Sequence, residues 1–575
     1  MKTLRQSLLD RDLAFLEVIA RRWGLVLEGR RKGEVLDQLE PELLRPEAVA
    51  ATLTELPQQE RAALDALLAA GGRMPAESFT RDHGPIRRIG PGRLRREEPW
   101  RQPVGGAEGL WYRGLIALGF DLETPEAEVV YIPSDLLPLL PRPHKKEPRF
   151  VVALAPLPEQ QKEGGPAFRQ DMCTFLIYLY CGPVRPGPKG ALPQRHLRRL
   201  LEGLLEGDPG RLALIEHLAR RLGLIEEHDR RLRLNPSRGR AWLRASPAQQ
   251  LRALQQGWRD SPDWNELWRV PGLQCQPTGW RNDPLATRRR LLSWLARCPP
   301  GGWLSAESFV QALKSADPDF QRPDGDYEGW YIRDAATGGY LTGFESWERV
   351  EGALIRDLLA RPLLWLGIVI LGMDEGRPAA FQITSRGEAF LAGEEPPAPE
   401  PTLPLAVAPD LTIRALLEGS LYDRFQLARF AERVPVLAGK DVPPFSYRIT
   451  PESLARSGEQ GIALSQIVAF LEQATEGSLP RNVPILLADW ERKGDKISLR
   501  RAVLLQTADE LTLQELQHLP QTRDYLREVL GPRAALVAEG DWSRLVQALK
   551  KLGYLPRVEG LGRDVTASPT LARRR

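Results

Sequence analysis

Two nine-residue stretches of this chain are nearly identical. Residues 71–79 are GGRMPAESF, and residues 301–309 are GGWLSAESF. Glycine commonly ends a helix, while proline and serine are favoured where a helix begins. The stretch therefore predicts the end of one helix, a short strand at the apolar pair, and the start of the next helix. Any fold of the chain must accommodate this arrangement at least twice.

A third copy is less similar but has the same order of elements. The apolar run 166–182 is followed by Leu192-Pro193, which we align with Met74-Pro75, and then by two helical patterns. Similar openings and similar ends at irregular spacing indicate one supersecondary unit used three times, and not a solenoid. Helix, short strand, two helices and a β-hairpin is the order of a winged helix, so we predict three of them. The ends of the third helices are predicted at Leu118-Gly119, Leu222-Gly223 and Leu366-Gly367.

The length and composition allow several domains. The chain has 575 residues, of which 42% are hydrophobic, enough for roughly three to five domains with their own cores. The Pro- and Glu-rich stretch 393–404 is typical of an extended spacer. The predicted fold class is mainly α with small β-hairpins (α+β). The predicted boundaries are 1–57 for an N-terminal helical region, 58–145, 146–243 and 284–392 for the first, second and third units, 244–283 for a Trp-rich helical connector, 393–404 for the spacer, 405–562 for a C-terminal domain and 563–575 for a basic tail.

Short motifs after the spacer carry a family resemblance. They are Pro409–Ile413 (PDLTI), Tyr447-x-Ile449-Thr450 with Ser453-Leu454, Leu479-Pro480-x-Asn482-Val483 and Trp490, followed by the strand-helix-strand pattern ALVAEGDWSRLVQALKKLGYLPRVEG. Together they cover roughly residues 401–562. This segment resembles the helicase-associated domain related to the N-terminal region of XPB-type helicases, which occurs in bacteria within helicases and in stand-alone proteins. The resemblance implies association with DNA-processing machinery and no catalysis. Together with the repeated units, it predicts tandem winged-helix domains followed by a helicase-associated domain.

The sequence offers no catalytic motif. An ATP-driven helicase needs a Gly-rich loop ending in Gly-Lys-Ser/Thr to hold phosphates. The nearest candidates, around Lys189 and Lys440, lack that ending and are followed by prolines. No Gly-x-Ser-x-Gly or HExxH pattern occurs, and the four cysteines form no CxxC pair. We therefore expect no enzyme activity, no metal site and no cofactor.

Arginine clusters are the candidates for DNA contact. Lys+Arg number 79 against 75 Asp+Glu, so local clustering is informative and the total charge is not. Arginine makes bidentate contacts with phosphate, and a helix with a hairpin can hold the major groove and the flanking backbone. The candidates in the first unit are Arg87, Arg88, Arg93, Arg95, Arg96 and Arg101; those in the second unit are Arg211, Arg220, Arg221, Arg230, Arg231 and Arg233; those in the C-terminal domain are Arg481, Arg492, Lys493, Lys496, Arg500 and Arg501. The alternative is a set of solvated surfaces whose arginines are compensated by glutamates.

Two further features leave alternatives open. The third unit carries Glu348 and Glu351 on its third helix and Asp374-Glu375 at its hairpin tip, which suits contact with protein better than with phosphate. An aromatic run between the second and third units indicates either a stacking or partner surface or packing between domains. Its members are Trp242, Trp258, Trp264, Trp268 and Trp280.

The sequence thus predicts a non-catalytic, helicase-associated accessory protein. It would grip duplex DNA with low sequence specificity and dock a separate helicase or nuclease. The alternative is a protein-interaction scaffold, or a protein resembling a transcription regulator, without direct DNA contact. Arginines paired with glutamates would favour the scaffold, and a continuous basic stripe would favour DNA. The N-terminus lacks the apolar core of a signal peptide and no apolar run is long enough to span a bilayer, so we expect a cytoplasmic protein.

Overall fold

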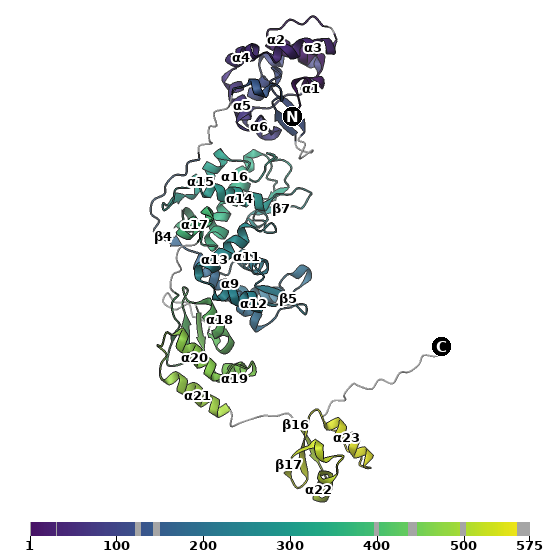
Figure 1. Cartoon of the computed structure of the whole chain (residues 1–575), viewed down its shortest axis with the longest axis vertical. Helices are drawn as coiled ribbons and strands as arrows, with labels where there is room; N and C mark the ends of the chain where they lie inside the picture. The colour runs from purple at the N-terminus through teal and green to yellow at the C-terminus, as the bar shows by residue number, and fades with distance from the viewer. Residues whose placement is uncertain are drawn as a thin grey trace, which may run out of the picture. The chain divides into compact units, whose positions relative to one another are not determined.

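The computed structural model describes residues 2–29, 31–120, 128–141, 150–395, 402–434, 445–494 and 502–559. They fall in two compact bodies, Met1–Pro480 and Arg481–Arg575, and each is described by itself. Helices with small antiparallel sheets make up both bodies (Figure 1). The predicted α+β class is confirmed.

The N-terminal part of the first body has its own hydrophobic core, which runs from Leu4 to Leu140. Its sheet has the order β1-β3-β2, with Met74 opposite Val130. Its elements are α1 (Leu4–Leu9), α2 (Leu13–Arg22), α3 (Lys32–Leu43), α4 (Pro46–Thr54), α5 (Gln58–Ala69), β1 (Arg73–Pro75), α6 (Ala76–His83), α7 (Pro91–Glu97), η1 (Pro99–Arg101), α8 (Gly106–Tyr112), β2 (Ala117–Phe120), β3 (Glu128–Tyr131) and η2 (Leu137–Leu139).

The stretch that opens the first unit ends one helix and begins another. The Gly72 amide donates to the Leu67 carbonyl (2.9 Å), which closes the last turn of α5. Gly72 has a φ of +85°, a conformation that favours glycine. The chain then forms β1 and enters α6 at Ala76, directly after Pro75. Phe79 is fully buried one turn into that helix.

The middle of the first body contains the second and third units. A shared hydrophobic core extends from Val152 to Phe425, so the two units are not packed as separate globules. The elements are β4 (Gln160–Lys162), α9 (Gly165–Cys181), η3 (Pro188–Gly190), α10 (Gln194–Gly203), α11 (Pro209–Arg221), β5 (Ile225–His228), β6 (Arg231–Leu234), α12 (Pro236–Arg244), α13 (Pro247–Arg259), η4 (Leu267–Arg269), β7 (Leu273–Cys275), α14 (Pro284–Leu295), β8 (Leu304–Ser305), α15 (Ala306–Ala316), β9 (Ile332–Asp334), η5 (Phe344–Ser346), α16 (Trp347–Leu358), η6 (Leu359–Leu363), β10 (Val369–Asp374), β11 (Arg377–Ile383) and α17 (Ser385–Ala392).

Two details of the sequence alignment are wrong. Leu192-Pro193 forms no strand; the bridge to the hairpin of the second unit comes earlier, between Val184 and Leu232. Leu118-Gly119 lies inside β2 and does not end a helix. The reason is that α8 already ends at Tyr112, where Gly114 takes the left-handed conformation (φ +71°).

The shared helix end is therefore a glycine followed by two apolar residues. In each unit the residue after the glycine donates its amide to the carbonyl five residues earlier, the bond of a Schellman motif. The three pairs are Leu115 to Leu110 (3.2 Å), Leu224 to Ala219 (2.8 Å) and Ile368 to Leu363 (2.9 Å). The glycines are Gly114, Gly223 and Gly367, all with φ between +64° and +71°. This motif, and not a Leu-Gly pair, repeats in all three units.

One segment of the chain contributes to both edges of the sheet of the third unit. Its order is β4-β10-β11-β8. The segment that contains β4 also pairs with the opposite edge, because Leu154 forms a bridge with Leu304 in β8. Residues 153–162, which we call the strap, thus connect the two edges. The bridge at Leu154 partly covers β8, which leaves less of that edge open to a further strand.

The chain after the spacer contributes to both bodies. Residues up to Pro480 belong to the first body, where α18 packs on α9 and Arg424 donates to the carbonyl of Gln170 (2.7 Å). The division after Pro480 falls inside the predicted 405–562 domain. The elements are β12 (Ala406–Val407), β13 (Thr412–Ala415), α18 (Leu421–Phe430), β14 (Glu432–Val434), β15 (Phe445–Arg448), α19 (Pro451–Glu459) and α20 (Leu464–Ala474) in the first body, and α21 (Asn482–Gly494), β16 (Ala502–Gln506), α22 (Glu510–His518), η7 (Arg523–Tyr525), β17 (Leu526–Gly531), β18 (Ala534–Ala538) and α23 (Trp542–Lys551) in the second.

Candidate functional site

The helix that would enter the DNA groove is buried in the first unit. All seven residues of α8 are buried. A Cβ on Gly106 would lie 2.3 Å from the Gln59 carbonyl oxygen, so α5 and α8 are in direct backbone contact. On another side Trp111 packs edge-on against Phe15 of α2, with ring centroids 5.4 Å apart. The first helix of the unit, α5, and α2 of the N-terminal region therefore cover the surface that a groove-binding helix needs.

The corresponding helices of the second and third units, α11 and α16, each bury one face, and that face includes a charged residue. In α11, Arg211 is fully buried and its Nε donates to Asp171 (2.7 Å). In α16, Glu351 is fully buried and accepts from Nε of Arg322 (2.6 Å). These charges are neutralised within the fold. Arg211 and Glu351 are therefore structural residues in this conformation.

The arginines predicted in the first unit are paired with acids. Arg87 holds the fully buried carboxylate of Glu108 (Nη2–Oε2, 2.7 Å). Arg93 and Arg96 share Glu97, and hydrogen bonding from Arg93 lowers the pKa of that carboxyl. The remaining pairs are Arg88 with Glu128, Arg95 with Glu17 and Arg101 with Glu98. The loop is thus a network of compensated charges.

In the second unit, some of the predicted arginines have partners within the fold and others do not. Arg220 pairs with Glu216 (2.7 Å), Arg221 donates to the carbonyl of Asp260, and Arg233 pairs with Glu226 (2.8 Å). Arg230 and Arg231, at the hairpin turn, are exposed and form no ion pair within the described part of the chain. They are the predicted residues of this unit whose charge is open to an external partner.

The predicted basic residues of the C-terminal segment are only partly described. Arg481 is exposed at the start of α21, and Arg492 lies 3.5 Å from Asp489. The side chain of Lys493, the residues Lys496, Arg500 and Arg501, and the tail 563–575 lie outside the described residues.

Sequence reasoning missed three exposed arginines on α10. Arg195, Arg198 and Arg199 occur in QRHLRRLLEG, at positions i, i+3 and i+4, which share one helix face. All three are exposed, and none forms an ion pair with a described acidic residue. The spacing of the arginines was a signal available from the sequence.

The tryptophan run divides between core and surface. Trp258 is fully buried and its Nε1 donates to Glu266 (2.8 Å), which also pairs with buried Arg288. Trp268 is exposed and stacks on Trp280, with centroids 5.6 Å apart. Packing between neighbouring elements accounts for Trp258, while Trp268 presents an aromatic face to solvent.

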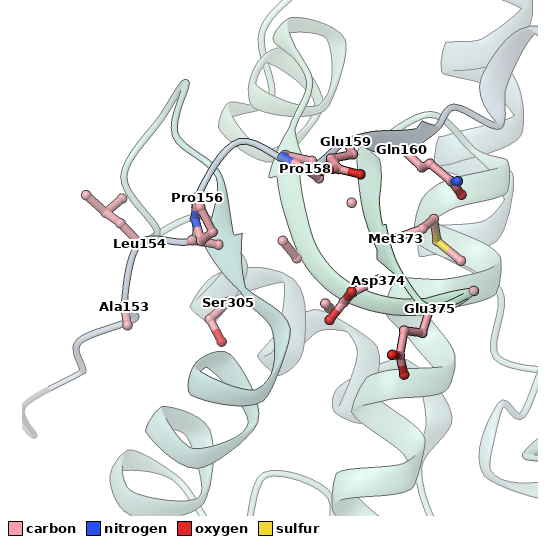
Figure 2. A pocket seen from close by; sticks show the side chains of 15 residues that line it. Ala153, Leu154, Pro156, Pro158, Glu159, Gln160, Ser305, Met373, Asp374 and Glu375 are labelled. Carbon is pink, nitrogen blue, oxygen red and sulfur yellow. The ribbon is translucent and has the colours of Figure 1, made fainter.

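A hollow of about 730 Å³ lies between the strap and the hairpin of the third unit (Figure 2). The strap is fixed over it because the Ser305 amide donates to the Ala153 carbonyl (2.9 Å) at one end and β4 pairs with β10 at the other. Glu159, Asp374 and Glu375 give the hollow an acidic rim. An opening of this size and charge fits a cationic side chain better than an anion.

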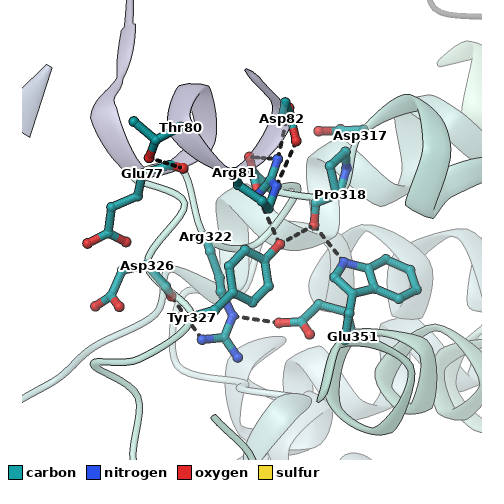
Figure 3. A network of polar contacts seen from close by, with 12 residues as sticks. Glu77, Thr80, Arg81, Asp82, Asp317, Pro318, Arg322, Asp326, Tyr327 and Glu351 are labelled. Carbon is teal, nitrogen blue, oxygen red and sulfur yellow. Dashed lines mark hydrogen bonds and ion pairs between the residues drawn. The ribbon is translucent and has the colours of Figure 1, made fainter. Parts of the chain in front are cut away.

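Arg81 makes the ion pair by which the first unit contacts the third (Figure 3). Arg81 of α6 forms a bidentate ion pair with Asp319 (2.6 and 3.1 Å) and stacks over Phe344, 4.7 Å from the ring centroid. The Tyr327 hydroxyl donates to the same carboxylate (2.8 Å). Nearby, burial and the charges of Asp326, Asp324 and Glu328 raise the pKa of Glu77.

The described residues contain no group of three or more His, Cys, Asp or Glu that could hold a metal ion. The four cysteines are free thiols. Burial raises the pKa of Cys298 to about 12 and that of Cys275 to about 11, so both are protonated at neutral pH. No helix in the described ranges is both long and apolar enough to cross a membrane.

Part of the chain after the spacer matches the model of a known family. Residues 405–530 match the model described as Helicase conserved C-terminal domain. The match covers less than half of the chain and supports a helicase-associated protein with a helicase-type domain. A search of curated proteins finds no match. The likeness to the N-terminal region of XPB-type helicases and the winged-helix units remain predictions.

Proposed function

We propose that the chain is a non-catalytic accessory protein of a helicase, and that its repeated units act as a scaffold for a partner. The units are interpreted as winged helices whose third helices pack inward. The observation that carries the proposal is the burial of α8, together with the internal ion pairs of Arg211 and Glu351. A groove-binding helix must instead be exposed.

The pairing of arginines supports the same role. All six arginines predicted as DNA contacts in the first unit have an acidic partner. Exposed ion pairs contribute little to stability but they do offset the positive potential that would attract phosphate. The acidic rim of the hollow in the third unit then supplies a surface for a basic segment of the partner.

Crosslinking in an extract of the native host, followed by reconstitution, tests the proposal. We expect a partner with nucleotide-hydrolysing motifs, whose DNA-stimulated ATP hydrolysis changes when the purified chain is added. Charge reversal at the hollow (D374K/E375K) should weaken the partner's binding, while E394K/E395K, the same charge change elsewhere on the surface, should not. ATP hydrolysis by the pure chain alone would show that the protein is itself a motor.

Contact with duplex DNA is a second candidate function. Arg230 and Arg231 favour it, because they are exposed and without an ion pair among the described residues. The test is binding of a labelled duplex between 50 and 200 mM salt. Neutralisation of six or more phosphates predicts a loss of about 10³-fold or more over that range. No binding at 50 mM salt would exclude this second function and leave the scaffold proposal untouched.

A further inference from the structure

The α10 face carries three arginines whose charge is not used inside the fold. Arg195, Arg198 and Arg199 are exposed, and the single acid of the helix, Glu202, forms no ion pair with them. A helix rises 1.5 Å per residue, so Arg195 and Arg199 lie about 6 Å apart along its axis. That separation allows neighbouring guanidinium groups to contact successive phosphates of one strand.

A second group of three arginines, on α7, has a different environment. Arg93, Arg95 and Arg96 also lie on a short helix, but each contacts a glutamate, either Glu97 or Glu17. The α10 arginines are therefore not exposed simply because the chain is rich in arginine. Within the described ranges, α10 carries a basic helix face without an acidic partner.

One of the three arginines is held in place by a neutral histidine. Nε of Arg195 donates to Nε2 of His196 (3.1 Å), while Nδ1 of His196 lies 2.7 Å from the Tyr178 hydroxyl. Burial and the charges of Arg195 and Arg199 lower the pKa of His196, which keeps Nε2 available as an acceptor. A guanidinium that is already oriented loses less conformational entropy when it binds.

We propose that the α10 face binds the phosphate backbone of duplex DNA. The inference rests on the second candidate function and on no part of the scaffold proposal. Arginine suits phosphate through its planar, bidentate geometry. A single strand is a poorer ligand, because binding of single strands uses aromatic side chains as stacking platforms and α10 contains no Phe, Tyr or Trp.

Two triple variants with the same change in charge test the assignment. They are R195Q/R198Q/R199Q on α10 and R93Q/R95Q/R96Q on α7. Binding of a labelled 20–30 base-pair duplex is measured by fluorescence anisotropy across the salt series, and circular dichroism checks that both variants are folded. Loss of three phosphate contacts should reduce the slope of log K against log salt by about 2.7, since each contact contributes about 0.9. The α7 variant should retain the slope of the unmodified chain.

Different results would contradict the assignment to α10, duplex binding itself, or the choice of duplex as the ligand. Equal slopes for both triple variants overturn the assignment to α10, although duplex binding itself would stand. Absence of binding by the unmodified chain at 50 mM salt refutes the second candidate function and this inference together. If the α10 variant loses slope of log K against log salt with single-stranded DNA but not with duplex, the ligand is single-stranded DNA and the proposal is contradicted. If the α10 arginines bind an acidic peptide and added duplex does not compete with it, the partner of this face is a protein.

A histidine signal gives a readout that misfolding does not mimic. An anion bound at Arg195 and Arg199 offsets the positive charges that disfavour protonation of His196. The pKa of His196, followed by NMR in the full chain, should therefore rise when duplex is added, whereas His518 of the second body provides a reference signal. An unchanged His196 titration at saturating duplex would contradict binding at this face.

Discussion

At the scale of single residues, buried charges determine which parts of the fold are structural. Arg322 and Glu351 are almost inaccessible and hold each other at 2.6 Å between the 317–330 segment and α16. Glu351 was noted in the sequence as part of an acidic surface suited to protein contact. The structure corrects that interpretation, because the side chain is fully buried and its charge faces Arg322.

Replacing Arg322 alone should destabilise the third unit strongly. The R322M variant leaves a buried carboxylate without its partner, which typically costs about 3–5 kcal/mol. The double variant R322M/E351L removes both charges and should recover most of that loss. Hydrogen exchange of α16 amides measures the effect locally. Equal protection in R322M and the unmodified chain would contradict the structural role of the pair.

His217 makes the first body sensitive to acid. Burial, assisted by Arg221 and Arg269, lowers the pKa of His217 to about 4, and its Nε2 lies 2.7 Å from the Ser261 hydroxyl. The unfolded chain binds a proton near pH 6.5, more readily than the folded one. The contribution to stability is therefore complete above about pH 6.5 and is lost as the pH falls toward 4.

The H217Q variant should flatten this part of the pH dependence. Glutamine can keep a hydrogen bond to Ser261 but does not titrate. Melting temperature measured from pH 7 to pH 4 should decline less steeply in the variant than in the unmodified chain. Parallel curves would show that other groups control the acid sensitivity.

At the scale of elements, close backbone contacts decide how helices and strands fit together. Gly372 in β10 is one such position, since a Cβ there would lie 2.7 Å from the Pro158 ring. Pro158 belongs to the strap, which is held to both edges of the sheet. The strap therefore depends on a residue more than 200 positions away in the sequence.

We expect G372A to displace the strap from β10. Amide exchange in β4 should accelerate, and the hollow in Figure 2 should widen, as measured by reactivity of a cysteine placed at Gln160. The control is G33A in α3, where a Cβ meets nothing within 4 Å and alanine is the better helix former. Unchanged exchange of β4 in G372A would show that the strap can absorb the extra methyl group.

At the scale of the whole molecule, Arg81 links segments far apart in the chain. Its guanidinium pairs with Asp319 and stacks over Phe344, while Ser78 lies against Gly325, where the added Cβ would approach within 2.2 Å of Oγ. Glu77 faces the acids Asp324 and Asp326, which oppose the same contact. The contact is therefore a balance between one strong pair and like-charge repulsion (Figure 3).

The R81A variant should release this contact while leaving both cores folded. A hydrogen-bonded charged pair contributes about 1.5–3 kcal/mol, so exchange should accelerate in α6 and in residues 317–330 together. R5A, which removes two ion pairs within the N-terminal helices, should leave residues 317–330 protected. Acceleration of α6 alone would mean that the two segments do not depend on each other.

The sequence by itself predicted the α+β class, which the structure confirms, and the strand and helix starts of the two near-copies. The near-copies at 71–79 and 301–309 each contain a strand followed by a helix start, because glycine, proline and serine act through local backbone geometry. The prediction of a helix end at Leu118-Gly119 was wrong. An apolar residue precedes that glycine, but the left-handed conformation that ends the helix is taken by Gly114.

Only the tertiary structure decided which surfaces are free. The sequence placed Arg87 and Arg230 in the same class, yet Arg87 holds buried Glu108 and Arg230 has no described ion pair. It also gave no sign that α8 would be covered on several sides, or that α10 would stay exposed. Ion pairs and burial join residues distant in the chain, so they follow from packing and not from local pattern. Helix starts and stops are local, and for that reason the sequence could determine them.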